Sequence, residues 1–259
     1  MTTASPYRAN LDNAPRAVAV LPSSKTPGEC IPLHHHRRGQ LTFAVSGIMR
    51  VETPEAAWIL PPARALWLPP QWPHTVIMRS HVELRTVYVD EPHCAALPLA
   101  PTLAEISGLL RELILALLEE PADYDENGRG GSLAKLILTE LGRLPEQRLS
   151  VPMPRDERAL RVARALFDDP GIDHDLDRWA DAAGASRRTL ARLFRSETGL
   201  GFAEWRARLR AVDGLARLSD GASVAETARA VGYASPSAFS AMLHRTLGGP
   251  PRRLVRAPA

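Results

Sequence analysis

The sequence lacks any segment long and apolar enough to cross a membrane. A transmembrane helix needs about 20 consecutive apolar residues, and the best candidate, residues 103–118, contains Glu105, Arg111 and Glu112. Residues 1–16 have no apolar run after their charged positions, so we expect no signal peptide. These two absences predict a protein that stays in the cytoplasm.

Cysteine is scarce, with only Cys30 and Cys94 in the 259-residue chain. Two cysteines are too few for the disulfide framework of a small secreted domain, and we expect two free thiols. A composition of 45% hydrophobic and 24% charged residues is that of an ordinary globular protein. The length allows two modest domains, each with its own hydrophobic core.

Lysine is absent from residues 155–259, which contain 18 arginines and 13 acidic residues and therefore have a net charge of +5. Residues 1–154 have a net charge of −2. A basic C-terminal half joined to a slightly acidic N-terminal half is typical of a nucleic-acid-binding module attached to another domain.

Short apolar runs separated by proline and glycine fill the segment between residues 41 and 89. Such runs are typical of the strands of a β-barrel or sandwich, and they lie at 41–45, 57–60, 65–68, 75–78 and 84–89. We therefore predict an N-terminal β-barrel domain over residues 1–100.

The hydrophobic period becomes helical after Pro101. Leucine and isoleucine recur three and four residues apart, which predicts helices over 102–120 and 132–144. Their apolar faces are richer than one side of a small barrel needs, so we predict that residues 101–145 form a helical dimerisation segment. The alternative is that both helices pack against their own barrel and leave a monomer. Three prolines close together then predict a linker at 146–155. Residues 156–259 are predicted to form an all-α domain, and the fold class is α+β.

The C-terminal region contains a weak internal repeat. Residues 176–195 and 224–243 are offset by 48 positions, and each copy has an alanine four places before a glycine, Ala180 with Gly184 and Ala228 with Gly232. Two steeply crossing helices need a small side chain where their backbones approach, and the tight turn between them favours glycine. Ser186 and Ser235 are placed to cap the second helix of each pair. The repeat predicts two helix-turn-helix units.

The second helix of the first unit has an apolar face and a basic face. Its outward side chains are predicted to be Arg187, Arg188, Thr189, Ala191 and Arg192. In a helix-turn-helix protein this helix lies in the major groove, so these side chains are predicted to contact double-stranded DNA. Apolar residues between 202 and 216 predict a connecting helix that holds the two units about 34 Å apart, the spacing of successive major grooves.

Two alternatives use the same helices without DNA. In the first, the chain is an unrelated helical bundle and the repeated alanine and glycine are coincidental. The matched serine caps and the basic charge argue against this. In the second, the domain is an adaptor that binds protein. The outward Arg187, Arg188 and Arg192 argue against that.

Residues 176–254 resemble the AraC/XylS family of transcription regulators. The resemblance is carried by Arg192–Gly199, Ala228–Phe239 and Leu247–Pro251. It implies base contacts by the first unit at Arg188, Ala191 and Arg192, and by the second unit at Ser237, Ser240 and Ala241. The small side chains of the second set imply weak base recognition, and Arg195 and Arg245 are expected to contact phosphates.

A histidine-rich segment lies between Gly28 and Gly47. Its spacing resembles the first cupin motif, with Gln40 where that motif has glutamate, and residues 69–74 resemble the second motif. The predicted barrel is therefore cupin-like or jelly-roll-like. On a strand, His34 and His36 share one face while His35 points away.

The resemblance implies a site at the mouth of the barrel. His34, His36, Gln40 and His74 are candidate ligands for a divalent metal such as zinc, iron, nickel or manganese. The alternative is a pocket that keeps these histidines without metal and binds an organic effector. Trp67 and Trp72 are candidates to line that effector pocket, although core packing is the commoner use of tryptophan.

Together these features predict a DNA-binding transcription regulator that responds to a small-molecule effector. The histidine and tryptophan motifs also resemble a subgroup of such regulators that control efflux or metabolic genes, which suggests a neighbouring target gene. The expected partners are operator DNA, the effector, a second copy of the chain and RNA polymerase. We do not expect the protein to bind a membrane. The alternative function is a metal-dependent cupin enzyme of dioxygenase type with a helical appendage. Gln40 in place of glutamate argues against this alternative, and we do not expect the protein to be an enzyme.

Overall fold

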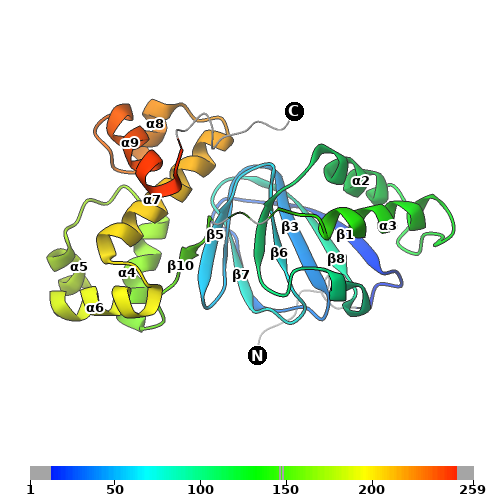
Figure 1. Ribbon diagram of the computed structural model, residues 1–259, viewed down its shortest axis with the longest axis horizontal. Helices are drawn as coiled ribbons and strands as arrows, with labels where there is room; N and C mark the ends of the chain where they lie inside the picture. Colours follow the sequence, from blue (N-terminus) through cyan, green and yellow to red (C-terminus); the bar gives the residue numbers. More distant parts are fainter. Residues whose placement is uncertain (1–12, 146, 148, 250–259) are drawn as a thin grey trace. The chain divides into compact units, whose positions relative to one another are not determined.

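The computed structural model describes residues 13–145, 147 and 149–249 (Figure 1). As predicted, the protein contains both strands and helices, with two antiparallel sheets in the N-terminal part and helices in the C-terminal part. Within the described residues, one compact unit comprises 13–49 and 60–147, and the other comprises 50–59 and 149–249. The second unit therefore includes a segment from the predicted barrel. Residues 1–12 and 250–259 of the predicted domains, with Pro250 and Pro251 of the closing motif, lie outside the described residues.

The first sheet has five antiparallel strands in the order β1-β8-β3-β6-β9. The strands are β1 (Val18–Lys25), β8 (Val82–Val89), β3 (Gly39–Ser46), β6 (Arg64–Leu68) and β9 (Thr102–Glu105). Residues that face each other across a pair lie on the same face of the sheet. Leu41 is paired with Trp67 and Val87, whereas Gln40 is paired with Leu68 and Tyr88. These two rows point to opposite faces.

The second sheet also has five strands, in the order β10-β5-β4-β7-β2. They are β10 (Val151–Pro152), β5 (Ala56–Leu60), β4 (Met49–Glu52), β7 (His74–Met78) and β2 (Cys30–His34). The barrel predicted from the sequence is not closed. Edge strands β1, β2 and β10 contain Pro22, Pro32 and Pro152, which have no N–H to donate across a further ladder.

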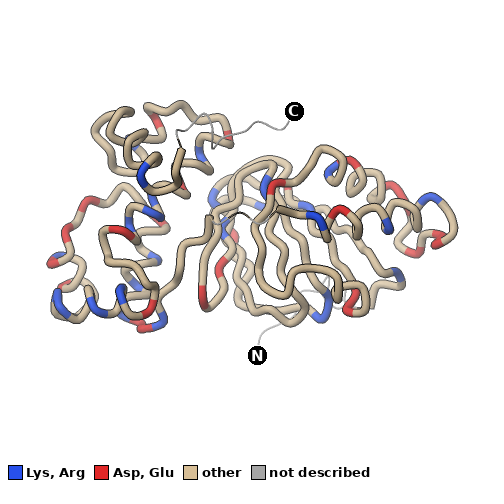
Figure 2. The backbone as a smooth tube through the Cα atoms, in the orientation of Figure 1, with Lys and Arg blue, Asp and Glu red and all other residues tan. Residues whose placement is uncertain are grey.

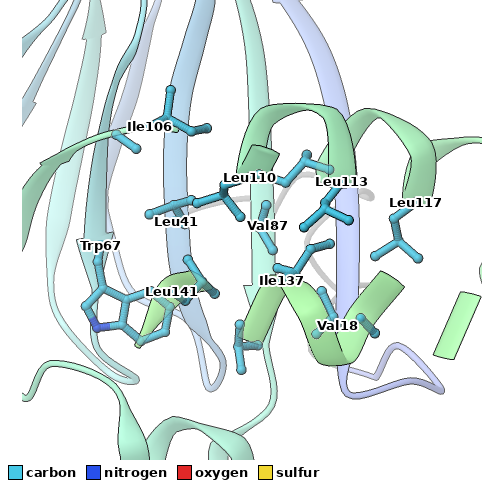
Figure 3. Packing of buried hydrophobic residues seen from close by; sticks show 14 of the residues in the cluster. Val18, Leu41, Trp67, Val87, Ile106, Leu110, Leu113, Leu117, Ile137 and Leu141 are labelled. Carbon is cyan, nitrogen blue, oxygen red and sulfur yellow. The ribbon is translucent and has the colours of Figure 1, made fainter. Parts of the chain in front are cut away.

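Two helices, α2 (Gly108–Leu118) and α3 (Arg129–Leu141), cover one face of the first sheet (Figure 3). Their buried side chains pack on the row that contains Leu41, Trp67 and Val87, and these helix residues include Leu110, Leu113, Leu117, Ile137 and Leu141. A short 3-10 helix, η1 (Glu91–Ala96), precedes this region. The prediction of helix from residue 102 was wrong for the first six positions, because Thr102–Glu105 pair with β6 as strand β9 and α2 begins at Gly108. Ser107 then caps α2 by accepting from the Leu110 N–H.

The apolar faces of α2 and α3 are used within the first unit. Leu110 is 0% exposed and Leu117 is 4% exposed, so neither is available to a partner. Of the described large hydrophobic side chains on these two helices, Leu109 and Leu136 are the exposed ones. Most of the apolar side chains on which the dimer prediction was based are therefore buried in the core of the first unit.

The C-terminal region forms the helices that the sequence predicts. They are α4 (Glu157–Asp168), α5 (Leu176–Ala183), α6 (Arg187–Thr198), α7 (Phe202–Ser219), α8 (Val224–Ala230) and α9 (Pro236–Leu247). The pairs α5–α6 and α8–α9 are the two helix-turn-helix units, and α7 connects them. Gly184 and Gly232 have φ values of 66° and 79°, the left-handed conformation expected at both turns.

Residues 149–155 do not run as the free linker predicted from their prolines; positions 146 and 148 lie outside the described residues. Val151 and Pro152 pair with β5 as strand β10. The Trp205 Nε1 donates to the Pro152 carbonyl at 2.6 Å, and the Arg208 Nε donates to the Ser150 carbonyl at 2.6 Å. Backbone carbonyls of a proline-rich segment remain acceptors, and α7 donates to them here.

None of the described helices is long and apolar enough to span a membrane.

Candidate DNA interface and histidine cluster

Helix α6 is built to present one face and bury the other. Leu190 and Phe194 are fully buried and Leu193 is 4% exposed, whereas Arg188 and Arg192 are exposed. The Ser186 hydroxyl accepts from the Thr189 N–H at 3.1 Å and so caps the first turn. The predicted burial pattern of this helix is confirmed.

The arginines of α6 differ in what holds them. Arg187 Nη1 donates to Asp177 at 2.6 Å, and Arg195 Nη1 donates to Glu204 at 3.2 Å. Arg188 and Arg192 make no hydrogen bond or ion pair with any other residue that the structure describes. They are four residues apart, so they project from the same face of the helix.

The remaining predicted residues of α6 are less accessible. Thr189 and Ala191 are half-buried, and the Thr189 hydroxyl lies 2.9 Å from the Ser186 hydroxyl. Along the C-terminal helices, basic and acidic positions are interspersed (Figure 2). The net charge alone therefore does not identify a binding face.

Helix α9 presents small side chains at the predicted positions. Ser237 and Ala241 are exposed, and Ser240 is half-buried. The Ser240 hydroxyl donates to the Pro236 carbonyl at 2.8 Å, and the Ser237 hydroxyl lies 3.0 Å from that of Ser235. Both hydroxyls are thus engaged within the helix and its cap, which agrees with weak base recognition by this unit.

The last turn of α9 presents two neighbouring exposed side chains. Arg245, a predicted phosphate contact, is exposed, and so is His244 beside it. His244 follows Ser237 by seven residues, which places it on the same helical face. The seven-residue spacing from Ser237 is the sequence feature that places His244 on this face.

Three histidines of the N-terminal part lie together. His34 ends β2, His74 begins β7, and these two residues are paired across the strands. His36 follows β2, and the ligand nitrogens of the three residues lie within 4.8 Å of one another. His36 and His74 are buried, whereas His35 is exposed and points elsewhere.

Backbone carbonyls orient two of the rings. The His34 Nδ1 lies 2.8 Å from the Pro32 carbonyl oxygen, and the His74 Nδ1 lies 2.9 Å from the Trp72 carbonyl oxygen. A carbonyl can only accept, so in both rings Nδ1 carries the proton. The lone pair is then on Nε2, which is the arrangement of a metal-binding imidazole held by a carbonyl.

Gln40 lies in a row that reaches the histidines. It is paired with Tyr88, and the Tyr88 ring is 5.2 Å from the His36 ring. Gln40 is 5% exposed, and its Oε1 has no hydrogen-bond partner within the described chain. An unsatisfied buried carbonyl oxygen is costly, so Gln40 is suited to accept from, or to coordinate, a bound group. The three imidazoles, which lie together, form a donor set that fits a divalent first-row metal ion.

Of the two tryptophans predicted to line the effector pocket, Trp67 does not lie with Gln40. Trp67 is on the opposite face of the sheet, 1% exposed, in the core under α2 and α3, and its Nε1 donates to the Pro98 carbonyl at 2.8 Å. Strand alternation requires this, because Trp67 is paired with Leu41 and not with Gln40. Trp72 is half-buried in the loop before β7 and contributes its carbonyl to His74.

A family model described as "Helix-turn-helix domain" matches residues 179–257, which include both units. The regulator NimR from Escherichia coli K12, named as an HTH-type transcriptional regulator, is 32% identical over 224 residues. That match covers 86% of this chain and 82% of NimR. A putative AraC-like transcription regulator from Streptomyces lividans is 39% identical over 87 residues, covering 33% of this chain and 29% of that protein. The chain belongs to the AraC family of helix-turn-helix transcription regulators.

This AraC-family protein is therefore a DNA-binding transcription regulator, as its sequence predicts, and its target is double-stranded DNA. The relatives are named as transcription regulators, and the enzyme alternative has no support among them. Among solved structures, the DNA-binding domain of AdpA in complex with a target DNA is 29% identical. It covers 38% of this chain and 89% of that chain, with a TM-score of 0.36. ToxT from Vibrio cholerae is 10% identical and covers 93% of this chain and 97% of that chain, with a TM-score of 0.39.

Proposed function

We propose that this regulator recognises its operator mainly through helix α6, with Arg188 and Arg192 reading base edges in the major groove. One observation carries the proposal: these two arginines are exposed, project from one face, and have no partner among the described residues. An unpaired guanidinium can donate two parallel hydrogen bonds to O6 and N7 of guanine. Arg195 and Arg245 contact phosphates, and Ser237, Ser240 and Ala241 approach bases without strong discrimination.

Alanine substitutions test this assignment. Arg188→Ala and Arg192→Ala should each weaken binding to the operator by about 1–3 kcal/mol and relax the base preference at one or two positions. Arg187→Ala is the matched control, because that guanidinium is paired with Asp177. The measurement is fluorescence anisotropy with an operator fragment identified by footprinting and with a random duplex. Equal losses on both duplexes would contradict base reading, since phosphate contacts behave in that way.

The N-terminal part is proposed to be a cupin-type domain that senses an effector at the histidine cluster. His34, His36 and His74, with Gln40, would hold a divalent ion of zinc, iron, nickel or manganese. Such an ion supplies a Lewis-acidic position to which an effector with an oxygen or nitrogen donor can bind. The same side chains suit an organic effector without metal, since imidazole and amide groups donate and accept hydrogen bonds.

The regulator is also proposed to act as a homodimer at a gene next to its own, with RNA polymerase as a further partner. The exposed Leu109 and Leu136 support a small contact between copies. A genomic footprint read beside the neighbouring gene tests the choice of target.

A further inference from the structure

The hairpin β4–β5 lies in the N-terminal half of the sequence, but its residues 50–59 pack within the second unit. Strand β4 begins at Met49, in the first unit, and continues through Arg50 into the second. Arg50 and Glu52 are only 4% and 6% exposed. Two buried charges on one strand need partners.

The Arg50 guanidinium contacts three groups. Its Nε lies 2.8 Å from Glu52 Oε1, its Nη1 lies 3.1 Å from Asp168 Oδ1, and its Cζ lies 5.0 Å from the centre of the Phe167 ring. Asp168 and Phe167 form the end of α4. The Arg50 side chain is 5% exposed, whereas that of Asp168 is 71% exposed, so Asp168 reaches the buried guanidinium from the surface. Removing a partner would leave a buried charge less well compensated, so these contacts hold the hairpin and α4 in one arrangement.

Phe167 is connected to helix α6 through a chain of aromatic contacts. It is fully buried and packs edge-on against Trp205 at 5.9 Å between ring centres. Trp205 in turn packs against Phe194 at 5.1 Å. Phe194 belongs to the buried side of α6, whose outer side carries Arg188 and Arg192.

Backbone hydrogen bonds attach the hairpin to the segment that precedes α4. Val151 is paired with Ala57, and the Met153 N–H donates to the Glu55 carbonyl at 2.8 Å. The Glu197 carboxylate of α6 accepts from the Arg155 N–H at 2.7 Å. The hairpin and α6 are thus connected to both ends of α4.

We propose that Arg50 is a positioning residue for DNA recognition. By holding hairpin 50–59 on α4, it fixes the orientation of α6 and of the two base-reading arginines. The inference rests on the proposed role of α6.

The test uses the full-length protein and the Arg50→Met variant, which keeps the length of the side chain but removes its charge. Arg85→Met is the matched control, because Arg85 also pairs with a glutamate two residues away, Glu83 at 3.7 Å, but lies in the first unit. Arg50→Met should weaken operator binding about 5- to 10-fold, in the range of coupling between distant sites. Binding to a random duplex and binding by Arg85→Met should change less than about twofold, since Arg50 is buried and Arg85 is half-buried, and nonspecific binding depends on exposed charges.

A second variant keeps the proposal testable if Arg50→Met does not fold. Asp168→Asn preserves size and exposure and should lower the preference for operator over random DNA in the same direction. If both variants fold, the double variant should bind no more weakly than Arg50→Met alone, because both changes remove one shared interaction. Equal losses on both duplexes, or an unchanged preference in Asp168→Asn, would overturn the proposal.

The two sets of variants separate base reading by α6 from the positioning role of Arg50. If Arg188→Ala and Arg192→Ala keep full specificity, base reading by α6 is wrong. If they lose specificity while Arg50→Met and Asp168→Asn do not, only the positioning role is wrong.

Discussion

The four arginines of α6 show how neighbouring side chains decide what a residue can do. Arg187 and Arg195 each face a carboxylate, so contacting DNA would first require breaking an ion pair. Arg188 and Arg192 can contact DNA without breaking an ion pair with any described residue. The sequence identifies all four arginines, but Asp177 and Glu204 come from other helices, so only the structure separates the two pairs.

The histidine cluster has a test of its own. Zinc bound to the purified full-length protein should amount to about one equivalent, because three imidazoles are a common zinc ligand set. The double variant His36→Ala, His74→Ala should retain less than about a tenth of an equivalent, since one imidazole does not hold the ion. Elemental analysis after dialysis measures both. His35→Ala, which changes an exposed neighbour, serves as the control.

Two outcomes of that experiment are informative about the ligand. Wild type without zinc, iron, nickel or manganese, but with a DNA affinity that responds to an organic effector, would remove the metal and keep the effector site. Equal zinc content in the wild type and the double variant would show that the cluster is not the site.

The turns of the two helix-turn-helix units differ at the level of the element, although both contain a glycine with positive φ. A Cβ on Gly184 would meet nothing within 4 Å, whereas a Cβ on Gly232 would lie 2.9 Å from the Gly171 carbonyl oxygen. Gly184→Ala should therefore cost only the left-handed backbone strain, about 1–2 kcal/mol of unfolding free energy. Gly232→Ala adds a backbone clash and should cost about 2–4 kcal/mol.

Urea unfolding followed by circular dichroism at 222 nm measures this difference. Equal destabilisation by the two alanines would contradict the packing described around Gly232. Asparagine at position 184 provides a control, because it tolerates the left-handed region better than alanine does.

The elements that the sequence predicts well are those whose pattern is local. Caps at Ser186 and Ser235, glycine turns and helical periodicity depend on neighbours within about one turn, and the helix-turn-helix units follow from them. The central strands also follow from short apolar runs. Strands β1, β2 and β4 were missed, because edge positions and the buried charges of Arg50 and Glu52 obscure the apolar pattern.

Other features depend on pairings between distant residues. Thr102–Glu105 form a strand because β6 is available as a partner, although their sequence continues into a helical pattern. Trp67 packs in the core because it is paired with Leu41, and no local signal reports that register. Residues 149–155 are ordered by Trp205 and Arg208, which lie more than fifty residues further along the chain.

At the scale of the whole molecule, the oligomeric state remains a prediction. If α2 and α3 mediate a dimer, the contact must use their exposed residues Leu109 and Leu136. Leu109→Glu combined with Leu136→Glu should then give a monomer in light scattering, with the fold intact. Leu99→Glu is the control, because Leu99 is 83% exposed and lies outside both helices. A wild-type monomer at micromolar concentration would end the dimer proposal.

An effector can regulate this protein only if it binds two states of the chain with different affinity. The hairpin 50–59 is a candidate for the element that differs between these states, since it follows Met49 of the first unit along the chain and packs on α4 in the second. Occupation of the histidine cluster would then change operator affinity while the second unit stays folded.

The central claim, that Arg188 and Arg192 read guanines, is tested most directly by changing the protein and the DNA together. Operator duplexes in which single guanines are replaced by 7-deazaguanine lack the N7 acceptor at one position. Wild type should lose about 5- to 30-fold in affinity at one or two guanines, the range of a base contact in the major groove. Arg188→Ala or Arg192→Ala should be insensitive to the same replacement. If both variants lose as much as wild type at every guanine, neither arginine contacts N7 and the account is wrong.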